Sequence, residues 1–345
     1  MEKIKVGIAG LGRSGWSIHA NLLSQIPNLY QIVAVCDPDE NRRKEAKEKF
    51  NCRDYIDFDE FLKDEDIELV IVATLSNLHA EHTIKALKSG KNVVCEKPMA
   101  TNLKDADEMI KASKETGKIL TIFQNRRYSP DFLKVKEIIE SGILGRIVLI
   151  KMLWHGFGRR WDWQTLKKYG GGTLNNTGPH MIDQALQLFG EREEPEIFCH
   201  MERTLTLGDA EDHVKIILKG KSSPMMDLEI TSCCCYPSEN WLVMATNGGL
   251  KGTFTELKWK YFNPDDLPER KVDEKPTPDR SYNVEQIPWK EEQKWLFTEK
   301  DSNYQINFYI DLYQTIKNKK PLKITPESVR RVMWVIEKCH QIAGI

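Results

Sequence analysis

Three glycines near the N-terminus constrain the fold of this chain more than any other feature. Gly10, Gly12 and Gly15 form a G-x-G-x-x-G pattern that follows the apolar run 4–9 and precedes helix-like sequence. In such a turn the first glycine permits a tight bend, the second lets a phosphate approach the main chain, and the third lets helix and strand pack closely. The helix that follows begins with free N–H groups, which can bind phosphate oxygens. The segment therefore predicts a βαβ unit with a dinucleotide-binding site.

Short apolar runs extend this pattern to about residue 123. We expect strands at 6–9, 31–36, 69–73, 92–95 and 119–123, separated by helices at 15–24, 39–50, 80–89 and 103–116. Buried strands that alternate with helices of this length form βαβ crossovers and a parallel sheet. The predicted fold class is therefore α/β, with a doubly wound parallel-sheet Rossmann domain over residues 1–123.

The sequence changes character after residue 123, which predicts a second domain over residues 124–345. We expect helices at 132–141, 172–189, 307–317 and 326–343, and strands at 147–154, 214–218, 226–231 and 242–245. This order indicates an α+β domain with a mostly antiparallel sheet and helices on one face. The polar stretch 260–300 is expected to be a long loop region, and the closing helices are candidates for packing back on the first domain.

Composition excludes several classes of partner. The chain has 50 basic and 51 acidic residues among 345, so no global field attracts it to nucleic acid or to an anionic membrane. The sequence has no apolar run of about 18 residues, so we expect no membrane-spanning helix. The N-terminus shows no leader, so we expect a cytoplasmic protein. The eight cysteines lack C-x-x-C spacing, and no metal site is predicted.

Residues around the glycine turn are candidates for binding the cofactor. Arg13 and Ser14 add donors in the turn itself. Asp37 follows the second strand, where an acid accepts hydrogen bonds from the adenosine ribose and repels a 2′-phosphate, so NAD is favoured over NADP. Arg42 is a further cofactor candidate, and it would favour NADP if its side chain reached back to the cofactor. We nevertheless expect Arg42 and Arg43 on the solvated face of their helix.

The loop after the third strand should line the same crevice, because the carboxyl ends of parallel strands meet at one edge. Thr74, Leu75 and Asn77 are candidate contacts to the pyrophosphate or to the nicotinamide ribose. His79 opens the next helix, where a ligand contact and a packing or capping role remain equally open.

A lysine follows the fourth predicted strand, in the segment Glu96-Lys97-Pro98. Beside a cationic nicotinamide, a partly desolvated lysine has a lowered pKa and can take the proton of a hydroxyl during hydride transfer. Glu96 is expected either to hold the cofactor ribose or to orient Lys97. The alternative for Lys97 is an ordinary solvated charge on the surface.

On these residues the chain resembles the Gfo/Idh/MocA family of NAD(P)-dependent oxidoreductases, which includes inositol and sugar dehydrogenases. The segments that carry the resemblance are 9–15, 91–98, 124–128 and 170–183. The resemblance implies that Lys97 is the acid/base and that His180 faces it and touches the reacting hydroxyl. It also implies an open-faced sheet in the second domain, used for contacts in a homodimer or homotetramer.

Asn176 departs from the pattern of that family, which usually has an aspartate four residues before the histidine. Positions four apart share a helix face, so Asn176 and His180 can still converge on substrate. An amide donates and accepts hydrogen bonds but carries no charge, so Lys97 lacks a stabilising anion and its pKa should fall further. Helix capping is the alternative for Asn176, and Asp183 is expected on the helix surface or in an orienting role.

Further substrate candidates lie in the aromatic segment 154–163, whose flat rings and charged groups suit a sugar. We select Arg160 and Trp163 there, although packing is the more frequent role of a tryptophan. From the segment that opens the second domain, Gln124 is a candidate for the cofactor and Arg127 for the substrate.

Together these features predict an NAD-dependent oxidoreductase for a small carbohydrate, polyol or sugar derivative. Hydride passes between a hydroxyl carbon and nicotinamide, with Lys97 as acid/base and with His180 and Asn176 positioning the hydroxyl. One alternative is an enzyme that retains NAD and oxidises a sugar transiently to eliminate a glycosidic bond. Another is a non-catalytic regulator that binds NAD.

Overall fold

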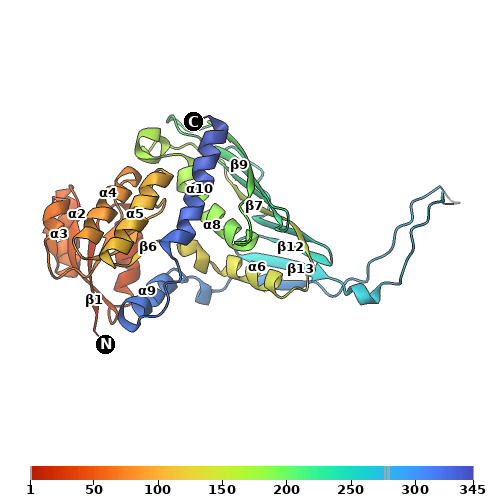
Figure 1. The fold of residues 1–345 in the computed structure, drawn as a ribbon, viewed down its shortest axis with the longest axis horizontal. Helices are drawn as coiled ribbons and strands as arrows, with labels where there is room; N and C mark the ends of the chain where they lie inside the picture. The colour runs from red at the N-terminus through yellow and green to blue at the C-terminus, as the bar shows by residue number, and fades with distance from the viewer. Residues whose placement is uncertain (1, 276, 278–279, 345) are drawn as a thin grey trace.

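The computed structural model describes residues 2–275, 277 and 280–344, which form two β-sheets with helices packed around them (Figure 1). The first sheet has six strands and the second has eight. The predicted fold class is confirmed, because a parallel α/β sheet is followed by a mostly antiparallel sheet with helices on one face. None of the described helices is long and apolar enough to cross a membrane.

The first sheet is parallel throughout and has the strand order β3-β2-β1-β4-β5-β6. Its strands are β1 Ile4–Ala9, β2 Tyr30–Cys36, β3 Arg53–Tyr55, β4 Leu69–Val72, β5 Asn92–Cys95 and β6 Leu120–Ile122. The strand order reverses between β1 and β4, so a crevice opens at the carboxyl ends of these two strands. The glycine turn and the loop after β4 both lie at this edge.

Helices connect the strands of the first sheet. They are η1 Arg13–Ala20 with the short α1 Asn21–Ser24, then α2 Glu40–Phe50, α3 Phe58–Leu62, η2 Ser76–Leu78, α4 His79–Lys88 and α5 Leu103–Thr116. The predicted helices and strands agree with these within a few residues. β3 and α3 were not predicted, because three and five residues are too few to show a period.

The second sheet has the order β14-β13-β12-β11-β7-β10-β9-β8, in which β7 and β10 pair in parallel and the other pairs are antiparallel. Its strands are β7 Ile147–His155, β8 Glu196–Glu202, β9 His213–Lys219, β10 Met225–Thr231, β11 Trp241–Ala245, β12 Gly248–Gly252, β13 Glu256–Tyr261 and β14 Gln293–Leu296. Helices α6 Pro130–Glu140, α8 Gly178–Phe189 and α10 Pro326–Ala343 cover one face (Figure 1). Alternate residues of β9 therefore point into the core, including Val214, Ile216 and Leu218.

Two expectations for the second domain were wrong in detail. The helix predicted over 172–189 is two helices, α7 Thr173–Asn176 and α8, because Pro179 cannot donate the hydrogen bond that a continuous helix needs. The stretch 260–300 contains β14, which pairs with β13. Much of the remainder extends away from the body (Figure 1), with short turns η6 Pro264–Asp266 and η7 Glu299–Asp301.

The closing helices bring the C-terminal part of the chain against the first sheet. In α9 Ile306–Asn318, Tyr309 is buried against His19 of η1. Arg330 of α10 pairs with Asp107 of α5, where Nη2 lies 2.9 Å from Oδ2. Helix α10 therefore contacts elements that lie far apart in the sequence. The remaining short turns are η3 Asn125–Tyr128, η4 Trp163–Thr165 and η5 Lys167–Tyr169.

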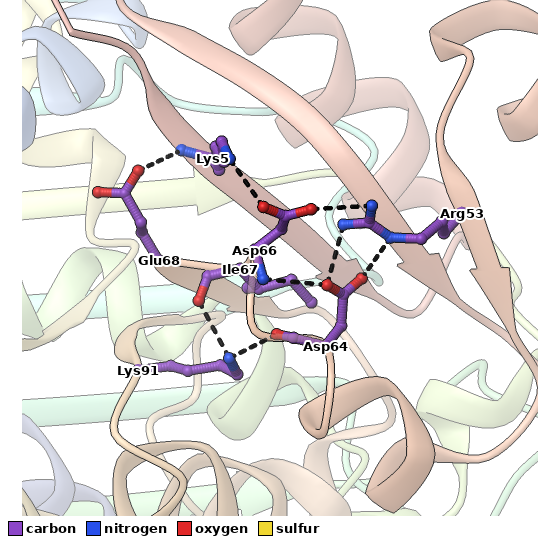
Figure 2. A network of polar contacts seen from close by, with 7 residues as sticks. All are labelled: Lys5, Arg53, Asp64, Asp66, Ile67, Glu68 and Lys91. Carbon is purple, nitrogen blue, oxygen red and sulfur yellow. Dashed lines mark hydrogen bonds and ion pairs between the residues drawn. The ribbon is translucent and has the colours of Figure 1, made fainter.

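A polar network closes the opposite, amino-terminal edge of the first sheet. Figure 2 shows its members, Lys5, Arg53, Asp64, Asp66, Ile67, Glu68 and Lys91. The Asp64 carboxylate accepts two hydrogen bonds from Arg53, at 2.7 and 2.9 Å. The Lys91 ammonium donates to the main-chain oxygens of Asp64 and Ile67, at 2.7 and 3.1 Å. These bonds hold the loop that leads into β4 against β3 and β5.

Candidate active site

The glycine turn leaves open space where a phosphate would approach. Gly10 has a φ of +89°, and a Cβ there would lie 2.4 Å from the oxygen of Ala73. A Cβ on Gly15 would lie 1.8 Å from the oxygen of Gly10, so both glycines are required by packing. A Cβ on Gly12 would meet no atom within 4 Å. The turn therefore fits a pyrophosphate, with Arg13 at the start of the following helix.

An acid and an exposed cation lie together beside this turn. The Asp37 carboxylate accepts hydrogen bonds from the N–H groups of Leu11 at 2.6 Å and Asp39 at 2.9 Å. Arg42 is half exposed, and its Nη1 lies 3.7 Å from the same carboxylate. Arg43 does not lie on the solvated face as expected, because it is buried and donates to the main-chain oxygen of Asp37.

The loop after β4 is held by a buried histidine. The two ring nitrogens of His79 lie 2.7 Å from the main-chain oxygen of Pro98 and 3.2 Å from that of Thr74. Burial lowers the pKa of His79, while the carbonyl oxygens of Pro98 and Thr74 and the charge of Glu96 oppose the shift. Since both nitrogens face main-chain groups, this geometry favours the packing role of His79 over a contact to the cofactor. Leu75 is half-buried and Asn77 is exposed in the same loop.

Glu96 is directed into the protein. Its Oε1 lies 2.9 Å from His19 Nε2, and its Oε2 accepts the main-chain N–H of Lys97 at 3.0 Å. Burial opposes ionisation, but the hydrogen bond and charge of His19 leave the pKa of Glu96 lowered. His19 contacts the hydroxyl of Tyr309 with its other nitrogen. These bonds favour the orienting role of Glu96 over a contact to the cofactor ribose.

Lys97 and Asn176, 79 residues apart in the sequence, meet directly. The Lys97 ammonium donates to the main-chain oxygen of Asn176 at 2.9 Å and to its Oδ1 at 3.1 Å. Asn176 ends α7, while Lys97 follows β5 at the carboxyl edge of the first sheet. The contact therefore joins the cofactor crevice to the second domain.

Burial lowers the pKa of Lys97, which is the direction that the sequence indicated. The carboxylate of Glu96 opposes the effect, and the positive charges of Arg13, Arg160 and Arg126 add to it. A larger share of the lysine is consequently the neutral amine near neutral pH. That is the form that accepts a proton.

His180, in the first turn of α8, lines a cavity that Lys97 and Asn176 also line. Burial and the charges of Lys97 and Arg126 hold the pKa of His180 well below its usual value, so the imidazole is neutral. Its Nδ1 is buried and has no partner among the residues that the structure describes. A buried ring nitrogen without a partner is suited to a ligand that brings one.

The cavity has a volume of about 420 Å³ and combines residues from the crevice and from the second sheet. Many of its side chains carry hydroxyl, amide or carboxyl groups. The side chains that line it are Arg13, Lys97, Trp154, His155, Arg160, Gln164, Thr165, Thr173, Asn176, Thr177, His180, Thr206, Glu211, Asp212, Ile230, Thr231 and Ser232. Such a lining suits a small polar ligand.

Glu211 was not identified from the sequence, yet it holds the helix that carries Asn176. Its Oε1 accepts the N–H of Leu174 at 2.9 Å, and its main-chain oxygen accepts the N–H of Thr173 at 3.0 Å. A Cβ on Gly172, whose φ is +109°, would lie 2.4 Å from this carboxylate. Burial raises the pKa of Glu211. Nothing in the local sequence marks this acid, because its partners lie 37 residues away.

Gln164 is a second residue that was missed. Its Nε2 donates to Asn176 Oδ1 at 3.3 Å, and its Oε1 accepts from Arg160 Nη2 at 2.6 Å. Arg160 forms two hydrogen bonds with Asp162, at 2.8 and 2.9 Å. Arg160 lines the cavity, with its charge already paired to Asp162.

Two predicted substrate residues lie elsewhere. The Arg127 guanidinium is bound by Asp183 at 2.6 and 2.8 Å and donates to Ser328, and it is absent from the described cavity lining. Asp183 is accordingly buried and orienting, not on the helix surface. Trp163 begins η4 and is likewise not among those lining residues, whereas Trp154 is. Aromatic content alone did not tell these two tryptophans apart.

Gln124 and Ser14 complete the predicted set. Gln124 is buried at the end of β6 and donates to the main-chain oxygen of Pro179 at 3.4 Å. Its Oε1 has no partner in the described part of the chain. Ser14 lies in the first turn of η1, beside Arg13.

Comparison with known proteins gives matches along most of the chain. Residues 4–124 match an oxidoreductase family with an NAD-binding Rossmann fold, GFO/IDH/MocA, and residues 132–251 match the GFO/IDH/MocA C-terminal domain. The uncharacterized oxidoreductase C115.03 of Schizosaccharomyces pombe is 33% identical over 258 residues, which are 72% of this chain and 70% of that protein.

Two further proteins are similar. The scyllo-inositol 2-dehydrogenase (NADP(+)) IolW of Bacillus subtilis is 34% identical over 222 residues, which cover 60% of this chain and 61% of IolW. The crystal structure of an NAD-binding protein from Listeria innocua has a TM-score of 0.82 at 24% identity, covering 100% of this chain and 98% of that one. This last likeness concerns the fold.

Proposed function

Because this chain belongs to the GFO/IDH/MocA family of NAD-binding oxidoreductases, we propose that it is a dehydrogenase of a polyol, sugar or sugar derivative. When bound, the dinucleotide supplies the acceptor or donor of hydride. The observation that carries the proposal is the meeting of Lys97, Asn176 and His180 on one cavity beside the glycine turn. Residues of these types at this place serve to hold a hydroxyl and remove its proton.

The cofactor would lie along the crevice at the carboxyl edge of the first sheet. Its pyrophosphate would contact the main chain at Gly12 and the donors of Arg13 and Ser14. Asp37 would receive the adenosine ribose, which favours NAD because a 2′-phosphate meets a carboxylate there. The partly exposed Arg42 is the group that a 2′-phosphate would use, and the similar IolW is named for NADP.

Lys97 would act as the base when a hydroxyl is oxidised and as the acid in the reverse direction. Its lowered pKa supplies the neutral amine, and Asn176 holds the nitrogen in place through two oxygens. The neutral imidazole of His180 would contact the same hydroxyl and align it for proton transfer.

Hydroxyl-bearing side chains support a polyhydroxylated substrate. Thr173, Thr177 and Ser232, each of which carries a hydroxyl group, line the cavity. Trp154 lines the same cavity, and its ring is held in place by the Arg126 guanidinium at 5.0 Å and by the Phe254 ring at 5.3 Å. The similarity to an inositol dehydrogenase agrees with this substrate class.

The test is the absorbance of reduced nicotinamide with purified protein, NAD⁺ or NADP⁺, and a panel of inositols, aldoses, glycosides and anhydrosugars. We expect one class of polyol or sugar to reduce the cofactor, with NAD⁺ preferred. If no compound of the panel reduced either NAD⁺ or NADP⁺, this result would count against a dehydrogenase.

The uncharged Asn176 favours a second candidate, a non-catalytic regulator that binds NAD, since proton relay through this position is unavailable. That candidate predicts NAD retained through gel filtration and no conversion of any substrate. Cleavage of a glycoside without net NADH, also with retained NAD, would instead indicate transient oxidation of a sugar.

The uncovered face of the second sheet supports a homo-oligomer, either a dimer or a tetramer. Phe198, Met225 and Met244 point outward there and are 55%, 38% and 44% exposed. Strand register places them on one face with Ile217 and Leu242. We propose that two copies bury this face against each other.

A further inference from the structure

The amide of Asn176 has two ends with opposite character, so its effect on Lys97 depends on which end faces the ammonium. Its Oδ1 lies 3.1 Å from Lys97 Nζ and accepts a hydrogen bond. A half-turn about the last bond of the side chain would direct the Nδ2 protons at the ammonium instead. A carboxylate has two equivalent oxygens and meets no such choice. Some other group must therefore select the orientation of this amide.

Gln164 is placed to make that selection. Its Nε2 donates to Asn176 Oδ1 at 3.3 Å, so the oxygen is shared between Gln164 and Lys97. The Gln164 amide is itself oriented, because its Oε1 accepts from Arg160 Nη2 at 2.6 Å. Arg160 is fixed in turn by two hydrogen bonds to Asp162, and Asp162 also accepts the main-chain N–H of Gln164 at 3.0 Å. The chain of bonds runs from an exposed ion pair to the half-buried lysine.

We propose that Gln164, oriented by Arg160, is a positioning residue that keeps Asn176 Oδ1 on Lys97 and turns Asn176 Nδ2 toward the cavity. Nδ2 has no protein acceptor among the described residues, so it is free to donate to an oxygen of the substrate. The inference deepens the proposed function, but the arrangement itself does not depend on that function. It can be tested in the protein without substrate or cofactor.

The charged groups around Lys97 set the background for such a test. The carboxylate of Glu96 favours the charged form of Lys97, the charges of Arg13, Arg160 and Arg126 oppose it, and Glu211 and Asp212 line the same cavity. His180 is neutral and contributes no charge. In this setting, exchanging a hydrogen-bond acceptor for a donor beside the ammonium should destabilise its charged form.

The experiment measures the pKa of Lys97 by competitive acetylation of lysine amines across a range of pH, followed by peptide mass spectrometry. Four proteins are compared: wild type, Gln164→Ala, Asn176→Asp and the double variant. We expect Gln164→Ala to lower the pKa of Lys97 by about 0.5–1 unit, because the amide is then free to turn. Asn176→Asp should raise it. In the Asn176→Asp background, removing Gln164 should have less than half of its original effect.

The double variant separates orientation from other consequences of the change. Loss of Gln164 also frees Arg160, whose charge affects the pKa of Lys97. Any change in pKa from this source occurs both with Asn176 and with Asp at this position, so it cancels when the two effects of Gln164→Ala are compared. Gln341→Ala, on the exposed end of α10, is the matched control and should leave Lys97 unchanged. An equal shift in both backgrounds, or none in either, would overturn the proposal.

A kinetic readout follows once a substrate is known. Gln164→Ala should lower kcat more than it raises KM, and Asn176→Asp should restore part of kcat in the double variant. If the protein reduces no cofactor, the proposed function fails while the acetylation result still decides the role of Gln164. The two failures are thus distinguishable.

Discussion

Lys97 is half-buried among charges of both signs, and the adjacent carboxylate of Glu96 is committed to His19 and to the main chain. We expect Lys97→Met to lower kcat by about 10²–10⁴-fold, the usual range for loss of a general acid or base. Binding of NAD⁺, measured by quenching of protein fluorescence, should stay within a few-fold of wild type. Equal losses in turnover and in cofactor affinity would point to a binding role.

The pH dependence of oxidation should report the same lysine. The neutral amine is the active form, so kcat/KM should rise with pH and level off above the lowered pKa of Lys97. Asn176→Asp places an anion beside the ammonium, which favours the charged form and should move this limb to higher pH. A limb that stays in place in this variant would mean that another group titrates.

Asp37 combines a structural and a selective role, because it binds two main-chain N–H groups where the adenosine ribose is expected. Asp37→Ser removes the charge that repels a 2′-phosphate and leaves Arg42 nearby. We expect the ratio of NADP to NAD affinity to rise by about tenfold or more, in line with loss of one unfavourable charge contact. The measurement is titration of both cofactors, with Asp37→Ser combined with Arg42→Ala as the variant in which the gain should be lost.

The elements of the first sheet are tied at the edge away from the cofactor, and Lys91 is central there (Figure 2). Lys91→Met leaves two main-chain oxygens without their donor, so we expect a loss of about 1–3 kcal/mol in the free energy of unfolding. Urea denaturation measures it, with the exposed Lys88→Met as the control. Cofactor affinity should not change, because the two edges lie at opposite ends of the strands.

Elements with strong end signals were predictable from the sequence. Helix α5 follows the cap residue Asn102 and ends before Gly117 in a left-handed conformation, and α10 begins with Pro326 after the cap Thr325. Short or polar elements were not. In β14 the sequence Gln-Lys-Trp-Leu becomes a strand only because β13 provides a partner edge.

At the scale of the whole molecule, the uncovered face of the second sheet is the feature that a single copy leaves unexplained. We expect Phe198→Asp combined with Met244→Asp to convert the oligomer into a monomer in gel filtration with light scattering. Circular dichroism should remain that of a folded protein, since both side chains point away from the core. Ile56→Asp, an exposed apolar residue of the first domain, is the control that should leave the mass unchanged. A wild-type mass equal to that of one chain would contradict the proposed oligomer.

The sequence by itself determined the class of fold and the residues at the strand ends, because burial period, glycine turns and helix caps are written within a few neighbouring positions. Only the tertiary structure decided which groups those residues contact. Glu96 pairs with His19, 77 residues away, and Arg127 pairs with Asp183, 56 residues away. Gln164 reaches Asn176 because the segment between them turns back, with the Gly172 N–H donating to the main-chain oxygen of Gln164 at 2.8 Å. Hydrogen-bond partners depend on how distant segments pack, and no local pattern encodes that packing.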